Sequence, residues 1–468
     1  MLTELINFTK PTGDPFADVG GLVIEYLQEK KPEKSIMELI EEATDIYVKK
    51  WNNNLHSFFL NSSITHNSNK GQKGIDKTIA FYQGLLDGEN AEYGFCRITG
   101  QQGEVFNGAR DNHIMSGSST LINFHHGFES GIRLSKEALI RIFFVPLGVE
   151  QLGNKVAVLT SNNEDVTRFF VRATMDNNSR DIGSGISESI QNSDFSNPTN
   201  ALFDYALQCI NNVRTATLDE DTGMSNTAGI TLNLFHFTNF GASPTINLFT
   251  LPATVFKFYS FCILKHKKDW QNFVFRFYSS SKFKNAQFDI DSKTWTNNKE
   301  TVEYKDYRIW RNSIFENLLN DKSILYAFLR HSKKYQLNFN IVETYQVNIR
   351  NMNKKALTKI KELANFIVTN RSDDEIKKSI TRLNGSKYSQ DLRKFLLKLV
   401  KQDHEEENPQ LLISLDEYVE YLFPDGTNWK EIRDLLLIAI YQKLHEVNKK
   451  IATEDIEENE SENQSNEE

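Results

Sequence analysis

The sequence predicts an α+β protein, in which a mixed α/β N-terminal region precedes a C-terminal helical bundle and an acidic, disordered tail. Three observations predict this class. Short β-rich runs alternate with amphipathic helical segments over the first half of the chain. Helical periodicity then continues from Asn353 to Ile451. The last fifteen residues, 454–468, carry eight acidic residues and no basic one, a composition typical of disorder.

The 468 residues divide into four predicted regions. These are a mixed α/β domain (1–250), a basic and aromatic-rich region (251–350), a helical bundle (351–453) and the tail (454–468). Hydrophobic residues make up 39% of the chain and aromatic residues 12%, which is enough apolar mass to fill more than one core.

The N-terminal region begins with a helix predicted over Ser35–Trp51, where apolar residues recur at helical spacing and Glu38 completes a capping-box pattern. Asn52–Lys73 is polar and predicts loops, and the glycine-rich stretch Arg97–Arg133 predicts strands and turns. The remaining predicted elements are a helix at Ser135–Leu147 and β-rich runs at Lys155–Thr160, Arg168–Thr174 and Gly229–Phe237.

The C-terminal region has helical periodicity in four stretches, Lys355–Val368, Ser389–Gln402, Ser414–Phe423 and Trp429–Val447. Helix stops and turns separate them at Asn384-Gly385, Pro409 and Pro424–Gly426. This pattern predicts a bundle of about four helices.

Charge is distributed unevenly along the chain. The 54 basic and 62 acidic residues give a formal net charge of −8, and the tail alone accounts for it. Residues 257–361 instead carry 21 basic and 9 acidic residues. Lysines there alternate with Phe and Tyr, as expected where charge follows phosphates and aromatic rings stack on bases. The alternative is a solvated face with ordinary core aromatics. We predict contact with a polyanion, through backbone contacts from Lys265, Lys267, Lys268, Lys282 and Lys284.

Motifs of several common protein classes are missing from the sequence. It contains neither a P-loop nor a G-x-S-x-G nucleophile motif. Its three cysteines are far apart, and no short-spaced pair of ligands accompanies His125-His126. The aliphatic run Leu435–Ile440 is far shorter than the roughly 18 to 20 apolar residues of a membrane span. We expect a soluble, cytoplasmic protein with reduced thiols and no membrane partner.

Two aspartates, Asp14 and Asp18, lie four residues apart between glycines. One interpretation makes them part of a metal-dependent nuclease or hydrolase site together with Asp111 and His113. The other is structural, a turn followed by a helix with Asp18 as its cap and the Gly20-Gly21 pair packed closely. The capping preferences of aspartate favour the structural interpretation.

The segment Phe8–Gly20, FTKPTGDPFADVG, resembles the signature T-G-[DN]-P-F-x-D-x-G of a known family. That family is the large subunit of type I CRISPR interference complexes (Cascade), in the subtype I-B branch. The resemblance covers about the first 170 residues. It continues in the family's order through Cys96–Gly100, Gly108–Asp111, Asn123-Phe124, Gly131–Gly148 and Val158–Asn162.

The resemblance implies a non-enzymatic, DNA- and RNA-binding subunit of a CRISPR RNA-guided ribonucleoprotein complex in antiviral defence. Such subunits recognise the protospacer-adjacent motif on target double-stranded DNA, help to unwind it, stabilise the R-loop and recruit a separate nuclease-helicase. The other implied partners are CRISPR RNA, the Cascade backbone and crRNA-end subunits, and a small helical subunit. A rival hypothesis is a scaffold subunit that contacts guide RNA and protein only.

Members of this branch often carry two Cys pairs that resemble a zinc finger. Here Cys96 remains, Thr99 occupies the second position, and no Cys stands around Ser135–Ala138, where the second pair would fall. We therefore expect no metal and no other cofactor.

We place motif reading in the glycine-rich stretch Gln101–Asn123. Amides and a guanidinium are the groups that read base edges, and Arg110 has the alternative of pairing with a nearby carboxylate. The candidate readers are Gln101, Gln102, Asn107, Arg110 and Asn112.

The C-terminal bundle resembles the small helical subunit of other type I complexes. Large-subunit genes of this branch can also yield that part from an internal start. The predicted internal start here is Met352, followed at once by a run of lysines.

Overall fold

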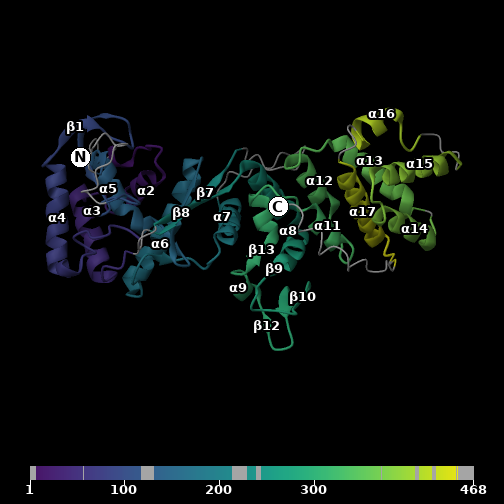
Figure 1. The fold of residues 1–468 in the computed structure, drawn as a ribbon. Coiled ribbons are helices and arrows are strands. Elements are labelled where there is room, and N and C mark those ends of the chain that lie inside the picture. The colour runs from purple at the N-terminus through teal and green to yellow at the C-terminus, as the bar shows by residue number, and fades with distance from the viewer. Residues whose placement is uncertain are drawn as a thin grey trace. The chain divides into compact units, whose positions relative to one another are not determined.

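The computed structural model describes residues 7–55, 57–117, 131–212, 229–238, 244–369, 371–405, 411–423, 428–449 and 451. Contacts divide the chain into two compact units (Figure 1). The N-terminal unit is Met1–Lys257 with Lys305–Arg311, and the C-terminal unit is Phe258–Tyr304 with Asn312–Glu468. The fold is α+β, as predicted. No helix in the described part of the chain has both the length and the apolar character needed to cross a bilayer.

Several residues named above lie outside the described ranges. They are Asn123 with Phe124, His125 with His126, Pro409, Pro424–Gly426 and the tail 454–468.

The N-terminal unit mixes helices with two sheets. Its helices are α2 (Pro15–Lys30), α3 (Ile36–Asp45), α4 (Gln72–Leu86), α5 (Lys136–Phe144), α6 (Glu164–Ser184) and α7 (Pro198–Asn212), with short helical turns η1 (Ile46–Lys50), η2 (Asn67–Asn69) and η4 (Val145–Gly148). Its strands are β1 (Glu92–Phe95), β2 (Gln102–Gly108), β3 (Ile132–Leu134), β4 (Glu150–Leu152), β5 (Lys155–Ser161), β6 (Gln191–Asn192), β7 (Leu232–Thr238) and β8 (Thr245–Leu251).

The larger sheet has the strand order β6-β4-β5-β7-β8, and only the β4–β6 pair is parallel. Successive side chains of a strand point to opposite faces, so the two faces pack against different helices. Phe16 of α2 covers one face, with its ring centroid 5.6 Å from Phe235 and 5.7 Å from Phe237. The opposite face carries Ala157 and Leu159, against which α6 and α7 pack.

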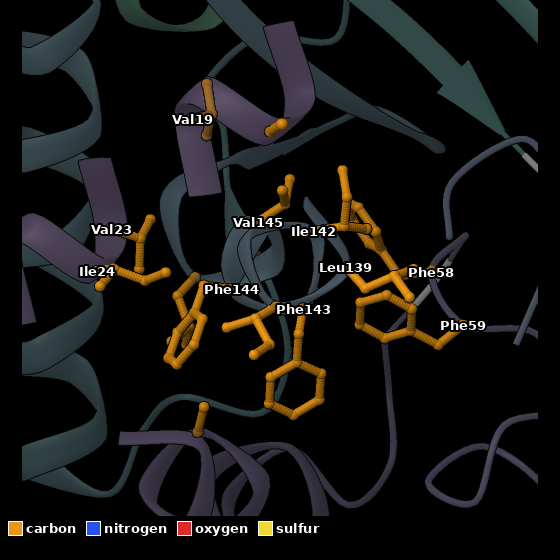
Figure 2. Close-up of a cluster of buried hydrophobic side chains, with 14 of the residues drawn as sticks. Val19, Val23, Ile24, Phe58, Phe59, Leu139, Ile142, Phe143, Phe144 and Val145 are labelled. Carbon is orange, nitrogen blue, oxygen red and sulfur yellow. The ribbon is translucent and has the colours of Figure 1, made fainter. Parts of the chain in front are cut away.

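The core of the N-terminal unit forms around α5, whose residues from Ala138 to Phe144 are all buried. Figure 2 shows Phe144 beside the α2 side chains Val23 and Ile24, and Leu139 and Phe143 beside Phe58 and Phe59. The rings of Phe59 and Phe143 stack with centroids 5.8 Å apart. Burying aromatic rings on both sides of one helix makes α5 the centre of this unit.

Most predicted elements of the N-terminal unit are confirmed. Ser35 and Glu38 form the predicted capping box at the start of α3, and Ser135 caps α5. The strands predicted at Lys155–Thr160 and Gly229–Phe237 correspond to β5 and β7.

The strand predicted at Arg168–Thr174 is wrong, because this segment lies inside α6. Its β-branched and aromatic residues favour a strand locally, but Phe170, Val171 and Thr174 recur at helical spacing and all three are buried. Asn163 caps the helix by accepting a hydrogen bond from the backbone N of Asp165 at 2.9 Å. Packing of one helical face against the sheet therefore outweighs local strand propensity.

The chain returns to the N-terminal unit at Lys305–Arg311 after its first passage through the C-terminal unit. Asn200 of α7 holds this segment, because its Nδ2 donates to the carbonyl oxygens of Arg308 (2.7 Å) and Trp310 (2.5 Å). Arg308 also pairs with Asp194 at 2.9 Å. One side-chain amide and one ion pair thus fix the returning segment on α7 and its neighbourhood.

The C-terminal unit is mainly helical. Its helices are α8 (Ala253–Val274, which begins in the N-terminal unit), α10 (Ser313–Leu319), α11 (Leu325–Ser332), α12 (Phe339–Asn348), α13 (Lys354–Val368), α14 (Asp373–Asn384), α15 (Ser389–Glu405), α16 (Leu415–Glu417) and α17 (Trp429–Glu446), with the turns η5 (Phe275–Phe277) and η6 (Tyr418–Leu422). Its short strands are β9 (Tyr278–Ser279), β10 (Gln287–Asp289), β11 (Thr294–Thr296) and β12 (Thr301–Val302). Helix α9 (Tyr304–Tyr307) and strand β13 (Arg311–Asn312) lie at the two ends of the segment Lys305–Arg311, which belongs to the N-terminal unit.

Helix α17 is the centre of the bundle, as Figure 1 shows. Its residues from Leu435 to Tyr441 are all buried, and a helix that is apolar on every side must be surrounded by others. It packs most extensively against α13 and α11, and also against α12, α14 and α15. Because α11 comes from the predicted basic region, most of that region and the bundle share one compact unit. The predicted helices of the bundle are confirmed, and α14 is additional.

Candidate nucleic-acid interface

The glycine-flanked aspartates near the N-terminus have structural partners. Asp14 caps α2, because its Oδ1 accepts hydrogen bonds from the backbone N of Phe16 (3.0 Å) and of Ala17 (2.8 Å). The prediction that Asp18 is the cap is therefore wrong, since the helix begins at Pro15 and Asp18 lies within its first turn. Proline fits the start of a helix because the missing N–H has no intrahelical acceptor there.

Asp18 closes the loop that precedes α2. Its carboxylate accepts from the backbone N (2.6 Å) and Oγ1 (2.7 Å) of Thr12 and from the backbone N of Gly13 (2.9 Å). It also lies 3.7 Å from Nη1 of Arg141, a guanidinium whose side chain is 3% exposed. Burial lowers the pKa of Arg141, and the Asp18 charge opposes that shift. The signature aspartates thus join the loop, α2 and α5.

The residues of the alternative nuclease hypothesis do not form a metal centre in the described part of the chain. No group of three or more His, Cys, Asp or Glu side chains among the described residues is placed to hold a metal ion. Burial lowers the pKa of His113, which lies near Asp14, and its Nδ1 is 3.3 Å from Oγ of Ser116. Asp111 is exposed.

The candidate motif readers lie on β2 and in the turn that follows it. Gln101 and Gln102 are exposed at the start of the strand, and Gln102 pairs in register with Phe95. Asn107 stands five residues further along, roughly 16 Å away, and its side chain points to the opposite face. The structure therefore does not gather these three amides at one point.

Asn112 has an internal role in the turn. Its Oδ1 accepts from the backbone N of Ala109 (2.7 Å) and its Nδ2 donates to the backbone O of Asn107 (3.1 Å). The side chain is buried, so its amide is already satisfied before any base arrives. Arg110, two residues earlier, is exposed and anchored through its backbone N, which donates to the carbonyl oxygen of Gly117 at 2.9 Å.

Cys96 is a buried free thiol. Cys96 begins the tight connection between β1 and β2, with its backbone N donating to the carbonyl oxygen of Gln101 at 2.9 Å and its own carbonyl accepting from the backbone N of Gly100 at 2.8 Å. Gly100 has φ +68°, which glycine adopts without strain. The loop keeps its shape through backbone hydrogen bonds and glycine.

The five predicted backbone-contact lysines are all exposed: Lys265, Lys267, Lys268, Lys282 and Lys284. The first three lie on α8, which kinks at His266 (φ −137°, ψ 36°). The other two lie in the connection between β9 and β10. Exposure at all five positions is the condition that phosphate contact requires.

The aromatic residues Phe258, Trp270 and Phe273 of α8 pack in the core. Phe258 and Trp270 are 0% and 2% exposed and meet edge to face with centroids 5.3 Å apart. Phe273, also buried, stacks on Phe328 at 4.6 Å. The expectation that these rings stack on bases is therefore wrong for α8, because the helix points its aromatic face inward and its lysines outward.

Lys293, which the sequence reasoning missed, adds a cation beside Lys267 and Lys268. Its Nζ donates to Oε1 of Gln271 at 2.9 Å and lies 5.8 Å from the centroid of the Phe275 ring. Gln271 stands three and four residues after the two α8 lysines, and such spacing puts all three on one helix face. Partial burial lowers the pKa of Lys293, and the charges of Lys268 and Lys267 lower it further.

These residues form what we call the three-lysine cluster: Lys267, Lys268 and Lys293. Composition alone could not have found Lys293, because it lies on a turn more than twenty residues from the α8 lysines. The only local signal is the turn itself, in which Oδ1 of Asp289 accepts from the backbone N of Asp291 and Ser292.

The predicted internal start, Met352, lies in the connection between α12 and α13, and its backbone N donates to the carbonyl oxygen of Gln346 at 2.9 Å. Two helices before it belong to the same packed bundle, because both α11 and α12 contact α17. A chain starting at Met352 would leave that part of α17 uncovered.

Comparison with known protein families gives a match in the C-terminal part of the chain. The family described as DevT C-terminal domain matches residues 330–467. The match begins in the last turn of α11 and therefore upstream of Met352. No curated protein matches the chain.

Proposed function

We propose that the chain is the non-catalytic large subunit of a CRISPR RNA-guided surveillance complex in antiviral defence. In this proposal it recognises the protospacer-adjacent motif on target double-stranded DNA, helps to unwind the duplex, stabilises the R-loop and recruits the nuclease-helicase. Guide pairing would read the sequence, while the protein reads a short duplex motif and holds the backbone. Its further partners would be CRISPR RNA, the Cascade backbone and crRNA-end subunits, and the small helical subunit.

The observation that carries the DNA-binding part of the proposal is the three-lysine cluster. Lys267 and Lys268 are exposed, and no carboxylate among the described residues lies within ion-pair distance of either. Like charges that gather on one face repel one another, and a phosphate backbone placed against them relieves that repulsion. Lys265, Lys282 and Lys284 would extend the same contact along the backbone.

We assign motif reading to the exposed residues at the two ends of β2. Gln101 and Gln102 offer amides at one end, and Arg110 offers a guanidinium near the other. Asn107 is half-buried and stays a candidate, whereas Asn112 is assigned to holding the turn in place. Because the two ends lie apart, we expect them to contact different positions of the duplex.

The proposal that the chain is not catalytic is supported by the hydrogen bonds that Asp14 and Asp18 already accept. Asp14 and Asp18 cap and close the start of α2, so both carboxylates already have hydrogen-bond donors in the folded protein. A nuclease would need them free to bind a metal or a water. A metal-dependent cleavage assay on the purified chain tests this directly, and cleavage lost in Asp18→Asn would favour the nuclease hypothesis.

The DNA-binding proposal is tested by charge reversal in the assembled complex. The affinity for a matched target duplex is measured between 50 and 200 mM salt for the unaltered protein, for Lys267→Glu/Lys268→Glu, and for the control Lys430→Glu, an exposed lysine of α17. We expect the double variant to bind more weakly and its salt slope to fall by about two, since each phosphate contact contributes about 0.9. Unchanged affinity and slope would contradict the assignment, and binding of guide RNA without target DNA would favour the scaffold hypothesis.

A further inference from the structure

A second basic feature lies within the C-terminal bundle, away from the α8 lysines in sequence. Residues 371–401 carry nine basic and four acidic residues. A cavity of about 290 Å³ opens here between α14, α15 and the end of α13. Its volume lies near the lower end of the range for small-molecule sites. We call it the α14–α15 pocket.

Helical spacing aims the charged residues of α14 into the pocket. Glu375, Lys378, Ser379 and Arg382 all line it, and they follow one another at the i, i+3, i+4, i+7 positions of a single helix face. On α15 the same spacing brings Lys398 to the rim. The neighbouring lysines on these two helices do not line the pocket, so the convergence reflects the fold and not a uniformly basic surface.

Three of the four cations that line the pocket have no ion-pair partner among the described residues. No carboxylate in the described part of the chain lies within ion-pair distance of Lys378, Arg382 or Lys398, and all three are exposed. Arg371 is the fourth cation of the lining, and its guanidinium lies 4.9 Å from the centroid of the Phe366 ring. An arginine that rests on an aromatic face is already oriented before a ligand arrives.

The one carboxylate of the lining takes part in the cap of α14. Glu375 completes the capping box of α14, accepting from the backbone N (3.0 Å) and Oγ (2.8 Å) of Ser372. These hydrogen bonds, first from the backbone and then from the side chain of Ser372, lower the pKa of Glu375. The charges of Arg371 and Lys378 lower this pKa further, so the one carboxylate is shared between the helix N-terminus and the four cations around the cavity.

The floor of the pocket is apolar. Ile367, Phe395 and Leu399 are at most 4% exposed, and Phe366 is half-buried. A dry floor lowers the local dielectric and strengthens the attraction between the rim cations and an anion. Lysine and arginine placed around a concave surface of this kind are the donors that phosphate oxygens prefer.

We infer that the α14–α15 pocket binds a phosphate group, carried either by a free polyphosphate or nucleotide or by a nucleic-acid backbone. Arg371 and Arg382 would supply paired N–H donors to phosphate oxygens, and Lys378 and Lys398 would supply point charges. The inference stands on the pocket alone and does not rest on the function proposed above.

The test uses the full-length chain without guide RNA. Binding of inorganic tripolyphosphate is followed by calorimetry, and binding of a fluorescein-labelled single-stranded DNA 20-mer by anisotropy. The pocket variant is Lys378→Gln/Arg382→Gln. Its control, Lys377→Gln/Lys394→Gln, removes the same number of charges from α14 and α15, at exposed positions outside the pocket. Thermal unfolding confirms that both variants fold.

We expect the pocket variant to bind tripolyphosphate at least tenfold more weakly than the control does. If DNA binding is unaffected, the ligand is a free phosphate compound; if it weakens to a similar degree, the site takes a nucleic-acid backbone. The inference is overturned if the pocket variant and the control lose the same affinity for both ligands, or if the unaltered chain binds neither. The lysines of α8 are intact throughout, so this outcome is independent of the function proposed above.

Discussion

Gly20 of α2 packs directly against the backbone of Arg141 in α5, so closely that a Cβ atom at position 20 would lie 1.9 Å from the Arg141 carbonyl oxygen. Backbone cannot move aside as the end of a side chain can. We therefore expect Gly20→Ala to lower the free energy of unfolding of the N-terminal unit by about 1–3 kcal/mol, the usual cost of overpacking. Urea denaturation followed by tryptophan fluorescence measures it.

Gly183 provides the matched control for this substitution. It lies inside α6, and an added Cβ would meet no atom within 4 Å. Alanine is the better helix former by roughly 0.5–1 kcal/mol, so Gly183→Ala should leave stability equal or higher. Equal stabilities of the two variants would mean that α2 and α5 can separate at little cost.

The pair Asp18–Arg141 leads to a second prediction. Removing the carboxylate leaves the Arg141 guanidinium, 3% exposed, without its ion-pair partner, and removes three hydrogen bonds to the preceding loop. Breaking a buried pair from one side costs about 3–5 kcal/mol. The Asp18 side chain is 25% exposed, so we expect the lower end, about 3 kcal/mol, for Asp18→Ala.

Asp14→Ala serves as the comparison, since it removes only a helix cap at a cost of about 1 kcal/mol. Chemical denaturation of both variants gives the ranking. If Asp14→Ala proved the more damaging, the loop would depend on the cap more than on the link between α2 and α5.

The buried histidine of the C-terminal unit makes stability depend on pH. Nδ1 of His331 lies 3.0 Å from Nη1 of Arg276, and because the guanidinium can only donate, the imidazole must accept. Burial, followed by the Arg276 charge, lowers the pKa of His331 to about 3. The unfolded chain takes up this proton near pH 6.5, whereas the folded chain stays neutral down to about pH 3.

This contribution to stability is therefore complete above pH 6.5 and is lost as the pH falls from 6.5 towards 3. Between pH 7 and pH 5 the loss amounts to about 2 kcal/mol. We expect His331→Gln, which keeps an acceptor, to reduce the acid sensitivity by that amount, and His404→Gln, at an exposed position, to leave it unchanged. Urea unfolding at both pH values measures the free energy of unfolding. If that free energy fell by the same amount between pH 7 and pH 5 in His331→Gln and in the unaltered protein, this account would be wrong.

The predicted product of the internal start has a structural consequence. A chain from Met352 lacks α11, whose Leu325, Phe328 and Leu329 are at most 6% exposed and pack in the unit that α17 centres. It also lacks the carbonyl of Ser332, which lies 2.9 Å from Nε2 of His445 on α17. Each buried side chain of this size contributes roughly 1.5–3 kcal/mol.

We therefore expect the fragment 352–468 to bind a hydrophobic dye and to self-associate, whereas a fragment 258–468, which keeps α8 with Phe273 against Phe328, unfolds cooperatively as a monomer. Light scattering and calorimetry of the two fragments make the comparison. Cooperative unfolding of 352–468 at the same temperature as the longer fragment would contradict it. Intact-mass analysis of the assembled complex, with and without Met352 changed, shows whether the shorter product is made.

Several elements were predictable from the sequence because their signals are local. The capping box of α3 and the apolar spacing of α3, α13 and α17 depend on residues within a few turns of one another. The Arg168–Thr174 error arose where local propensity and packing disagree, since only the sheet under α6 shows which face is buried.

The candidate sites were less predictable, because charge counts depend on the window in which they are made. The excess of basic over acidic residues in 257–361 pointed to α8. Lys293 joins the three-lysine cluster only because its turn brings it back to Gln271. The α14–α15 pocket was hidden, because acidic residues elsewhere in 362–453 bring that stretch to a slight negative charge. Two helices must pack before their basic faces meet.

The contact between Gly20 and Arg141 also shows which property of the protein the N-terminal signature indicates. Its two aspartates, Pro15 and Gly20 are each occupied in capping α2, closing its loop or fitting it against α5. Chains that share these residues would therefore share a helix junction, whatever duplex they meet. Where such chains differ in ligand preference, we expect the sequence differences responsible to lie at the exposed positions around β2. The signature itself should not indicate which ligand a chain prefers.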